Sequence, residues 1–131
     1  MEVRVPIKAR CLVVLLATAV CGPLAQAAGS IKVENALAQC VELQPGVRST
    51  TAQAVLLQAN VNVKKSIGEC GCKSAIAQYT SKVEMDGYRS FLQSGAVALR
   101  ESGPQTLTLT SSAQLLGDRG VVLSLGCAAP D

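Results

Sequence analysis

Four cysteines, Cys40, Cys70, Cys72 and Cys127, are the residues of this sequence with the clearest capacity for chemistry. The other two of its six cysteines lie near the N-terminus, in a segment that is expected to be removed. An even number of cysteines in an exported chain predicts disulfide bonds, here two. Four cysteines allow three pairings, and each pairing implies a different use of the central Cys-Gly-Cys sequence.

Strand directions favour some pairings over others. If successive strands alternate in direction, the closing strand ends at Cys127, beside the start of the segment that follows Cys72. Cys127 is then expected to bond to Cys70 or Cys72, and Cys40 to the other. The pairing Cys40–Cys70 with Cys72–Cys127 is slightly favoured, while Cys40–Cys72 with Cys70–Cys127 stays open. Each such bond would contribute about 2–4 kcal/mol to stability.

The third pairing joins Cys70 to Cys72 and predicts thiol–disulfide redox chemistry. A disulfide across Cys-Gly-Cys closes a small, strained ring that is easily reduced. Lys73 would favour the thiolate, but no histidine supports it and the spacing is not that of Cys-x-x-C. A structural zinc on the four cysteines would require reduced thiols and is a weaker alternative.

Other catalytic patterns are largely excluded by composition. The sequence contains no histidine, so Ser-His-Asp and Cys-His catalysis and imidazole metal ligands are absent. Glu84 and Asp86 lie two residues apart beside a predicted turn, which is typical of a solvated hairpin tip rather than an acid/base pair. The sequence shows no phosphate loop, nucleophile elbow or metal-ligand spacing. We therefore expect no catalytic residues, no cofactor and no metal.

Residues 1–27 have the layout of a secretory signal peptide. Three basic residues precede an apolar stretch at 11–20, and a run of small residues ends in Ala25-Gln26-Ala27, which predicts cleavage between Ala27 and Ala28. The apolar stretch is shorter than the roughly 20 residues that span a bilayer, so no stable membrane span is expected after cleavage. Lipoprotein processing at Cys21 stays an alternative. The predicted location is periplasmic or secreted, in a Gram-negative bacterium.

Residues 28–131 are expected to form a single exported β domain. Three of the 12 Lys and Arg residues and one of the 9 Asp and Glu residues lie in the signal segment, which leaves a net charge of +1. The aromatic residues are Tyr79, Tyr88 and Phe91. Weak charge and few stacking platforms argue against a nucleic-acid partner.

Strands are predicted wherever apolar and polar residues alternate. The clearest covers 57–64, and others are expected at 28–35, 37–43, 73–85, 88–99, 106–110 and 121–126. Asp86-Gly87 predicts a type I′ hairpin that pairs 83–85 with 88–90, and Gly95 is predicted to form a bulge. Pro45-Gly46 predicts a loop over 44–51, and 51–56 is expected to be partly helical.

Six or seven short strands with turn signals between them predict an all-β fold. The expected architecture is a small, antiparallel, immunoglobulin-like β-sandwich held by disulfides. A core without tryptophan must be built from valine, leucine, isoleucine and alanine, and would depend on the disulfides for part of its stability.

Three sequence elements carry a resemblance to a known family. They are Glu34-Asn35 followed by Cys40, the hexapeptide Cys70-Gly71-Cys72-Lys73-Ser74-Ala75, and a terminal Cys127 followed by alanine and proline. In these elements the chain resembles a family of small exported bacterial proteins of unknown function. The resemblance implies export and the use of the cysteines, and it implies no activity.

The function expected from the sequence is that of a non-catalytic binding or interaction protein of the cell envelope. Its partner would be an unknown envelope protein. One alternative is an envelope thiol–disulfide redox protein that uses Cys70 and Cys72. Another is a lipoprotein anchored through Cys21.

Overall fold

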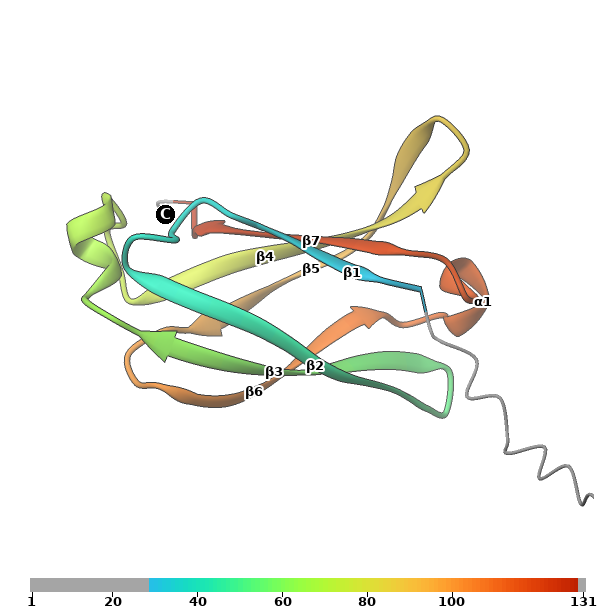
Figure 1. Ribbon diagram of the computed structural model, residues 1–131, viewed down its shortest axis with the longest axis horizontal. Coiled ribbons are helices and arrows are strands. Elements are labelled where there is room, and N and C mark those ends of the chain that lie inside the picture. The colour runs from blue at the N-terminus through green and yellow to red at the C-terminus, as the bar shows by residue number, and fades with distance from the viewer. Residues whose placement is uncertain (1–28, 130–131) are drawn as a thin grey trace, which may run out of the picture.

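Seven strands form two packed sheets in the computed structural model, which describes residues 29–129 (Figure 1). One sheet has the strand order β1-β7-β4-β5 and the other the order β2-β3-β6. The strands are β1 (Ile31–Asn35), β2 (Val41–Thr51), β3 (Ala54–Val63), β4 (Ile76–Met85), β5 (Tyr88–Ala98), β6 (Gly103–Thr110) and β7 (Val121–Cys127). The 3-10 turn η1 (Ile67–Cys70) and the short helix α1 (Ala113–Leu116) lie in the connections.

The predicted all-β, disulfide-bonded sandwich is confirmed, and its layout is immunoglobulin-like in having seven strands in two sheets. Its strand order differs from that of an immunoglobulin constant domain, in which the first two strands are neighbours in one sheet. One strand pair is parallel, because β1 lies beside β7 with Ile31 opposite Val121. All the other paired strands are antiparallel.

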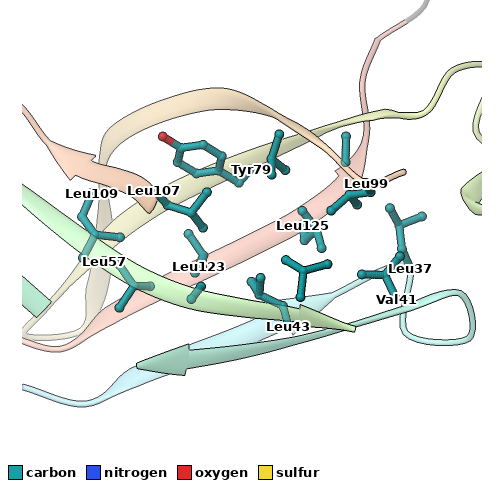
Figure 2. Packing of buried hydrophobic residues seen from close by; sticks show 14 of the residues in the cluster. Leu37, Val41, Leu43, Leu57, Tyr79, Leu99, Leu107, Leu109, Leu123 and Leu125 are labelled. Carbon is teal, nitrogen blue, oxygen red and sulfur yellow. The ribbon is translucent and has the colours of Figure 1, made fainter. Parts of the chain in front are cut away.

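Period-two alternation builds the core between the sheets. In β3, Leu57, Ala59 and Val61 are buried, while the polar residues between them are exposed. Figure 2 shows leucines of both sheets meeting in the interior, with Tyr79 among them. Because successive strand residues point to opposite faces, β3 presents one apolar face to the core and one polar face to water.

Two predictions for the β2–β3 region are wrong. Residues 44–51 were expected to be a loop, but β2 runs through them and pairs with β3. Pro45 is tolerated because β2 is an edge strand, and because the register shifts between Pro45 and Arg48. The helix expected within 51–56 is absent, since Ala52 and Gln53 form a turn and β3 begins at Ala54.

A turn replaces the first part of the strand predicted at 37–43. Asn35 organises this turn, because its side-chain amide donates to the Val41 carbonyl at 2.7 Å and accepts from the Leu37 N–H at 2.8 Å. Asparagine often satisfies nearby backbone groups in this way, which competes with strand pairing. The chain therefore crosses from β1 in one sheet to β2 in the other over residues 36–40.

The β4–β5 hairpin forms at the predicted place and projects beyond the rest of the sandwich (Figure 1). Met85 lies opposite Tyr88, so the turn has two residues, Asp86 and Gly87. The predicted type I′ geometry is wrong, because only Gly87 has a positive φ, of 83°. The turn needs left-handed backbone at one position, and glycine adopts it without steric penalty.

The predicted bulge at Gly95 is also misplaced. The register of β4 and β5 shifts between Ser81 and Lys82, where Leu92 is the extra residue. Gly95 instead lies opposite Tyr79, and a Cβ on it would come within 2.7–2.9 Å of the tyrosine ring and hydroxyl. Glycine is needed there for a close approach, which sequence alone does not distinguish from a bulge.

Candidate functional site

The four cysteines form two disulfides at one end of the sandwich. Cys40 bonds to Cys70 and Cys72 bonds to Cys127, with Cα–Cα distances of 6.3 and 5.2 Å. This is the pairing that the sequence slightly favoured. Cys40 is fully buried and Cys72 nearly so, whereas Cys127 is exposed. The first bond ties the β1–β2 turn to η1, and the second ties the entry to β4 to the end of β7.

Local backbone geometry separates Cys70 from Cys72. The Ser66 hydroxyl accepts a bond from the Gly68 N–H at the start of η1. Gly71 ends η1 in the left-handed region, with φ of 93°, and its N–H donates to the Gly68 carbonyl. The chain thus reverses between the two cysteines and sends them to different partners. Glycine is favoured between them because other residues rarely adopt this φ.

The Cys70–Cys72 disulfide that the redox alternative requires is therefore not formed. Both sulfurs are engaged with distant partners, Cys40 and Cys127, and neither bonds to the other. The arrangement is suited to cross-linking, because each bond joins segments that are far apart in sequence. Within residues 29–129, no group of three or more Cys, Asp or Glu side chains is placed to hold a metal ion.

The carboxylate pair singled out in the sequence lies at the hairpin, as part of a charged surface. Arg89 donates to Glu34 at 2.8 Å and lies 3.9 Å from Glu84. These side chains are roughly two-fifths exposed, so the ion pairs are solvated and contribute little to stability. The Arg89–Glu34 pair ties β5 to β1, although these strands lie at opposite edges of their sheet. Asp86 lies in the turn.

Arg48 holds together the other end of the sandwich. Its guanidinium donates to the carbonyls of Gly117 at 2.8 Å, and of Gly29 and Arg119 at 3.3 Å each. Partial burial lowers the pKa of Arg48 from its ordinary value, and the Asp118 carboxylate opposes that shift. Gly29 packs so closely on the backbone of Asp118 and Arg119 that a Cβ would not fit. Arg48 thus fastens the start of the domain to the loop before β7.

Replacing Arg48 with methionine is expected to destabilise the domain by about 1–3 kcal/mol. Methionine retains the apolar stem but leaves three carbonyls without their charged donor. Urea denaturation of both proteins would measure the difference in the free energy of unfolding. Arg100→Met is the matched control at an exposed position and should stay within about 0.5 kcal/mol of the wild type. Equal effects of the two substitutions would contradict the proposed role of Arg48.

An apolar groove lies between the inner side of the β4–β5 hairpin and α1. Met85 and Leu92 are partly buried against the core at its base, while Leu115 on α1 is 59% exposed. Tyr88 and Phe91 on the same hairpin are each 62% exposed. The groove is lined by Val83, Met85, Ser90, Phe91, Leu92, Gln114, Leu115 and Arg119. We refer to it below as the hairpin groove.

The groove was not predicted from the sequence, because α1 has only four residues and was not predicted either. The one available signal was the aromatic content, since two of the three aromatic residues lie in the first four positions of β5. The structure brings together the cysteines, but it does not connect them to the hairpin groove. The predicted cleavage residues Ala25, Ala27 and Ala28, and the alternative lipid site Cys21, lie outside the described residues.

Residues 14–130 match a family model described as an uncharacterized protein conserved in bacteria, DUF2195. The chain belongs to this family. The resemblance to a bacterial family of unassigned function is therefore confirmed, although the family match does not single out the Cys-Gly-Cys-Lys-Ser-Ala motif. No curated protein and no solved structure matches the chain. For residues 29–129, the structure contains no helix long and apolar enough to cross a membrane.

Proposed function

We propose that this DUF2195 protein is an exported, non-catalytic binding domain that recognises a protein of the bacterial envelope. The proposal has two parts, export and binding, which rest on separate observations. Export is supported by the disulfides together with the signal-like N-terminus, and binding by the hairpin groove.

Two disulfides support export because such bonds persist in oxidising compartments and are rare in the bacterial cytosol. The hexapeptide from Cys70 to Ala75 supplies one cysteine to each bond. We accordingly propose this motif as the structural signature of the family. Cleavage between Ala27 and Ala28 would leave a chain that begins one residue before Gly29. Gly29 already belongs to the folded domain, because it packs against the backbone of Asp118 and Arg119. Anchoring through Cys21 is the alternative form of the same exported domain.

The binding role is supported by the position of the large apolar side chains that the protein leaves exposed. Exposed aromatic residues are enriched at protein interfaces, particularly where apolar neighbours surround them. Phe91 and Leu115, from different elements, lie on the same groove, and Tyr88 lies on the adjoining hairpin tip. We propose that the groove receives an apolar side chain of the partner, with Leu115 at its rim.

Site-specific photo-crosslinking in the bacterial envelope tests this function. A photoreactive residue at Leu115 is expected to give one discrete adduct with an envelope protein, identified by mass spectrometry. The substitution Leu115→Asp is tested with the photoreactive residue placed at the neighbouring Gln114. It should abolish the adduct, because a carboxylate in an apolar site is strongly disfavoured.

Val47 provides the matched control. It is a 70% exposed aliphatic residue on β2, in the other sheet. A probe at Val47 should not give the adduct, and Val47→Asp should leave the Gln114 adduct unchanged. Equal crosslinking from both positions would refute specific recognition by the groove, and a protein retained in the cytosol would refute export.

A further inference from the structure

The two disulfides follow one another along the chain. Cys40 bonds to Cys70 and Cys72 bonds to Cys127, so the loops that they close are neither nested nor interlocked. A chain that enters an oxidising compartment from its N-terminus therefore meets its native cysteine partners in the order in which they appear. The one competitor in that order is Cys72, which follows Cys70 by two residues and could bond to Cys40 in its place.

Local contacts bring Cys40 and Cys70 together. β2 and β3 form a hairpin directly after Cys40, and at its open end the Cys40 carbonyl accepts from the N–H groups of Lys64 and Lys65, at 2.8 and 3.2 Å. The turn η1 starts just beyond these lysines and ends at Cys70. All of these contacts lie within residues 40–70, so none of them requires the later strands to be in place. Contacts between residues that are near in sequence form faster than those between distant segments.

The second bond depends on the other end of the chain. Cys127 ends β7, where it lies opposite Ala77 of β4. β7 also pairs with β1, so its place in the sheet requires strands from both ends of the domain. The sequence separation is 55 for Cys72–Cys127 and 30 for the first bond, and closing a longer loop costs more entropy. Both factors delay the second bond relative to the first.

Gly71 keeps the Cys72 thiol away from the first disulfide. Its φ of 93° reverses the backbone, and its N–H donates to the Gly68 carbonyl at 3.2 Å. The Cys72 N–H donates to the Ile67 carbonyl at 3.1 Å, which holds the reversed chain in place. The Cys72 side chain is thereby directed to the end of β7. Because a thiol exchanges with a disulfide only where it has access to a sulfur, the turn protects the first bond while Cys72 is still free.

We propose that this chain is the substrate of a disulfide oxidase of the Cys-x-x-C class and needs no disulfide isomerase, because Cys40–Cys70 closes first and Cys72–Cys127 second. In each step, one thiolate of the pair attacks the oxidase disulfide, and the other attacks the resulting mixed disulfide and releases the oxidase as a dithiol. Two thiols of this chain thus lose two electrons and two protons, which the oxidase gains. The encounter with an oxidase rests on the proposed export, since such enzymes act in oxidising compartments.

Reoxidation of the purified protein, after reduction in guanidinium and dilution, tests the order of the bonds. The oxidant is an excess of a purified bacterial Cys-x-x-C oxidase in its disulfide form, and free thiols are alkylated at successive times. Trypsin leaves Cys70 and Cys72 together in residues 66–73, so fragmentation in the mass spectrometer must locate the alkyl group. Species with one bond should contain Cys40–Cys70, with the other two cysteines alkylated. Addition of a disulfide isomerase should not raise the final yield of the native pairs.

Gly71→Ala measures the contribution of the turn. A Cβ at this position meets no atom within 4 Å, so alanine encounters only the penalty of left-handed backbone. The ratio of Cys40–Cys70 to Cys40–Cys72 should therefore fall by about fivefold or more. Gly87→Ala is the matched control, because Gly87 also has a positive φ, of 83°, and open space around its Cβ position. It lies in the β4–β5 turn, at the other end of the sandwich from η1, and should leave the ratio unchanged (Figure 1).

Each part of the proposal has a result that would overturn it. Predominance of Cys40–Cys72 or Cys72–Cys127 among the species with one bond would contradict the order. A higher native yield with the isomerase than without it would show that the oxidase alone is insufficient. Equal effects of Gly71→Ala and Gly87→Ala on the ratio would remove the role of Gly71. All of these measurements use purified protein, so they are independent of export and of any partner at the hairpin groove.

Discussion

Removal of the Cys40–Cys70 disulfide by the double substitution Cys40→Ala/Cys70→Ala is expected to lower the free energy of unfolding by about 3.6 kcal/mol. This value is the free-energy equivalent of the conformational entropy that the unfolded chain loses when a disulfide joins residues with a sequence separation of 30. Because Cys40 is fully buried, loss of its sulfur adds a packing term of the same sign. Guanidinium denaturation monitored by circular dichroism would measure the change.

The second disulfide provides the comparison. Cys72→Ala/Cys127→Ala removes a bond with a separation of 55, for which the same relation gives about 4.2 kcal/mol. The two closed loops share no residues, so their effects should add. Together they approach the whole stability of a small domain, and the fully reduced protein is expected to be unfolded. A loss below about 1 kcal/mol for either pair would contradict a structural role for that bond.

Gly95→Ala is expected to destabilise the protein by about 1–3 kcal/mol, a large effect for the addition of one methyl group. The new Cβ would overlap the ring of Tyr79, which is 5% exposed and is held by bonds between its hydroxyl and Thr108. Because the ring is buried and anchored, it cannot rotate away without losing these bonds. Thermal and urea unfolding of the variant would measure the effect.

A double-mutant cycle identifies the cause. Tyr79→Ala alone should cost about 3–5 kcal/mol, but Gly95→Ala should then be nearly neutral because the obstructing ring is gone. Gly126→Ala in β7, a strand of the same sheet, is the matched control, since a Cβ there meets no atom within 4 Å. If Gly95→Ala were equally destabilising with and without Tyr79, backbone preference rather than the ring would be responsible.

The prediction for Gly95 also shows the limit of reading a strand from its sequence. A glycine within a strand indicates either a bulge or a close approach, and only the position of Tyr79 distinguishes them. The bulge falls at Leu92, where nothing in the local sequence marks it. Pro45 presents the same problem, because it indicates a loop unless the strand is known to lie at a sheet edge.

Local patterns by themselves determined the fold class, most of the strands, the position of the β4–β5 turn and the presence of two disulfides. They could do so because side-chain alternation and turn preferences act between residues that are near in sequence. Alternating strand directions also placed Cys127 beside Cys70 and Cys72, because direction constrains which chain ends meet, and the observed partner is Cys72.

Only the tertiary structure decided which strands became neighbours, which edges were covered and which apolar side chains stayed exposed. The parallel pairing of β1 with β7 joins the two ends of the domain, and the hairpin groove exists because α1 packs near β5. The Arg48 bonds likewise reach across about 70 residues, with separations of 69 to Gly117 and 71 to Arg119. Such contacts depend on the packing of whole sheets, and no periodicity within a single segment encodes them.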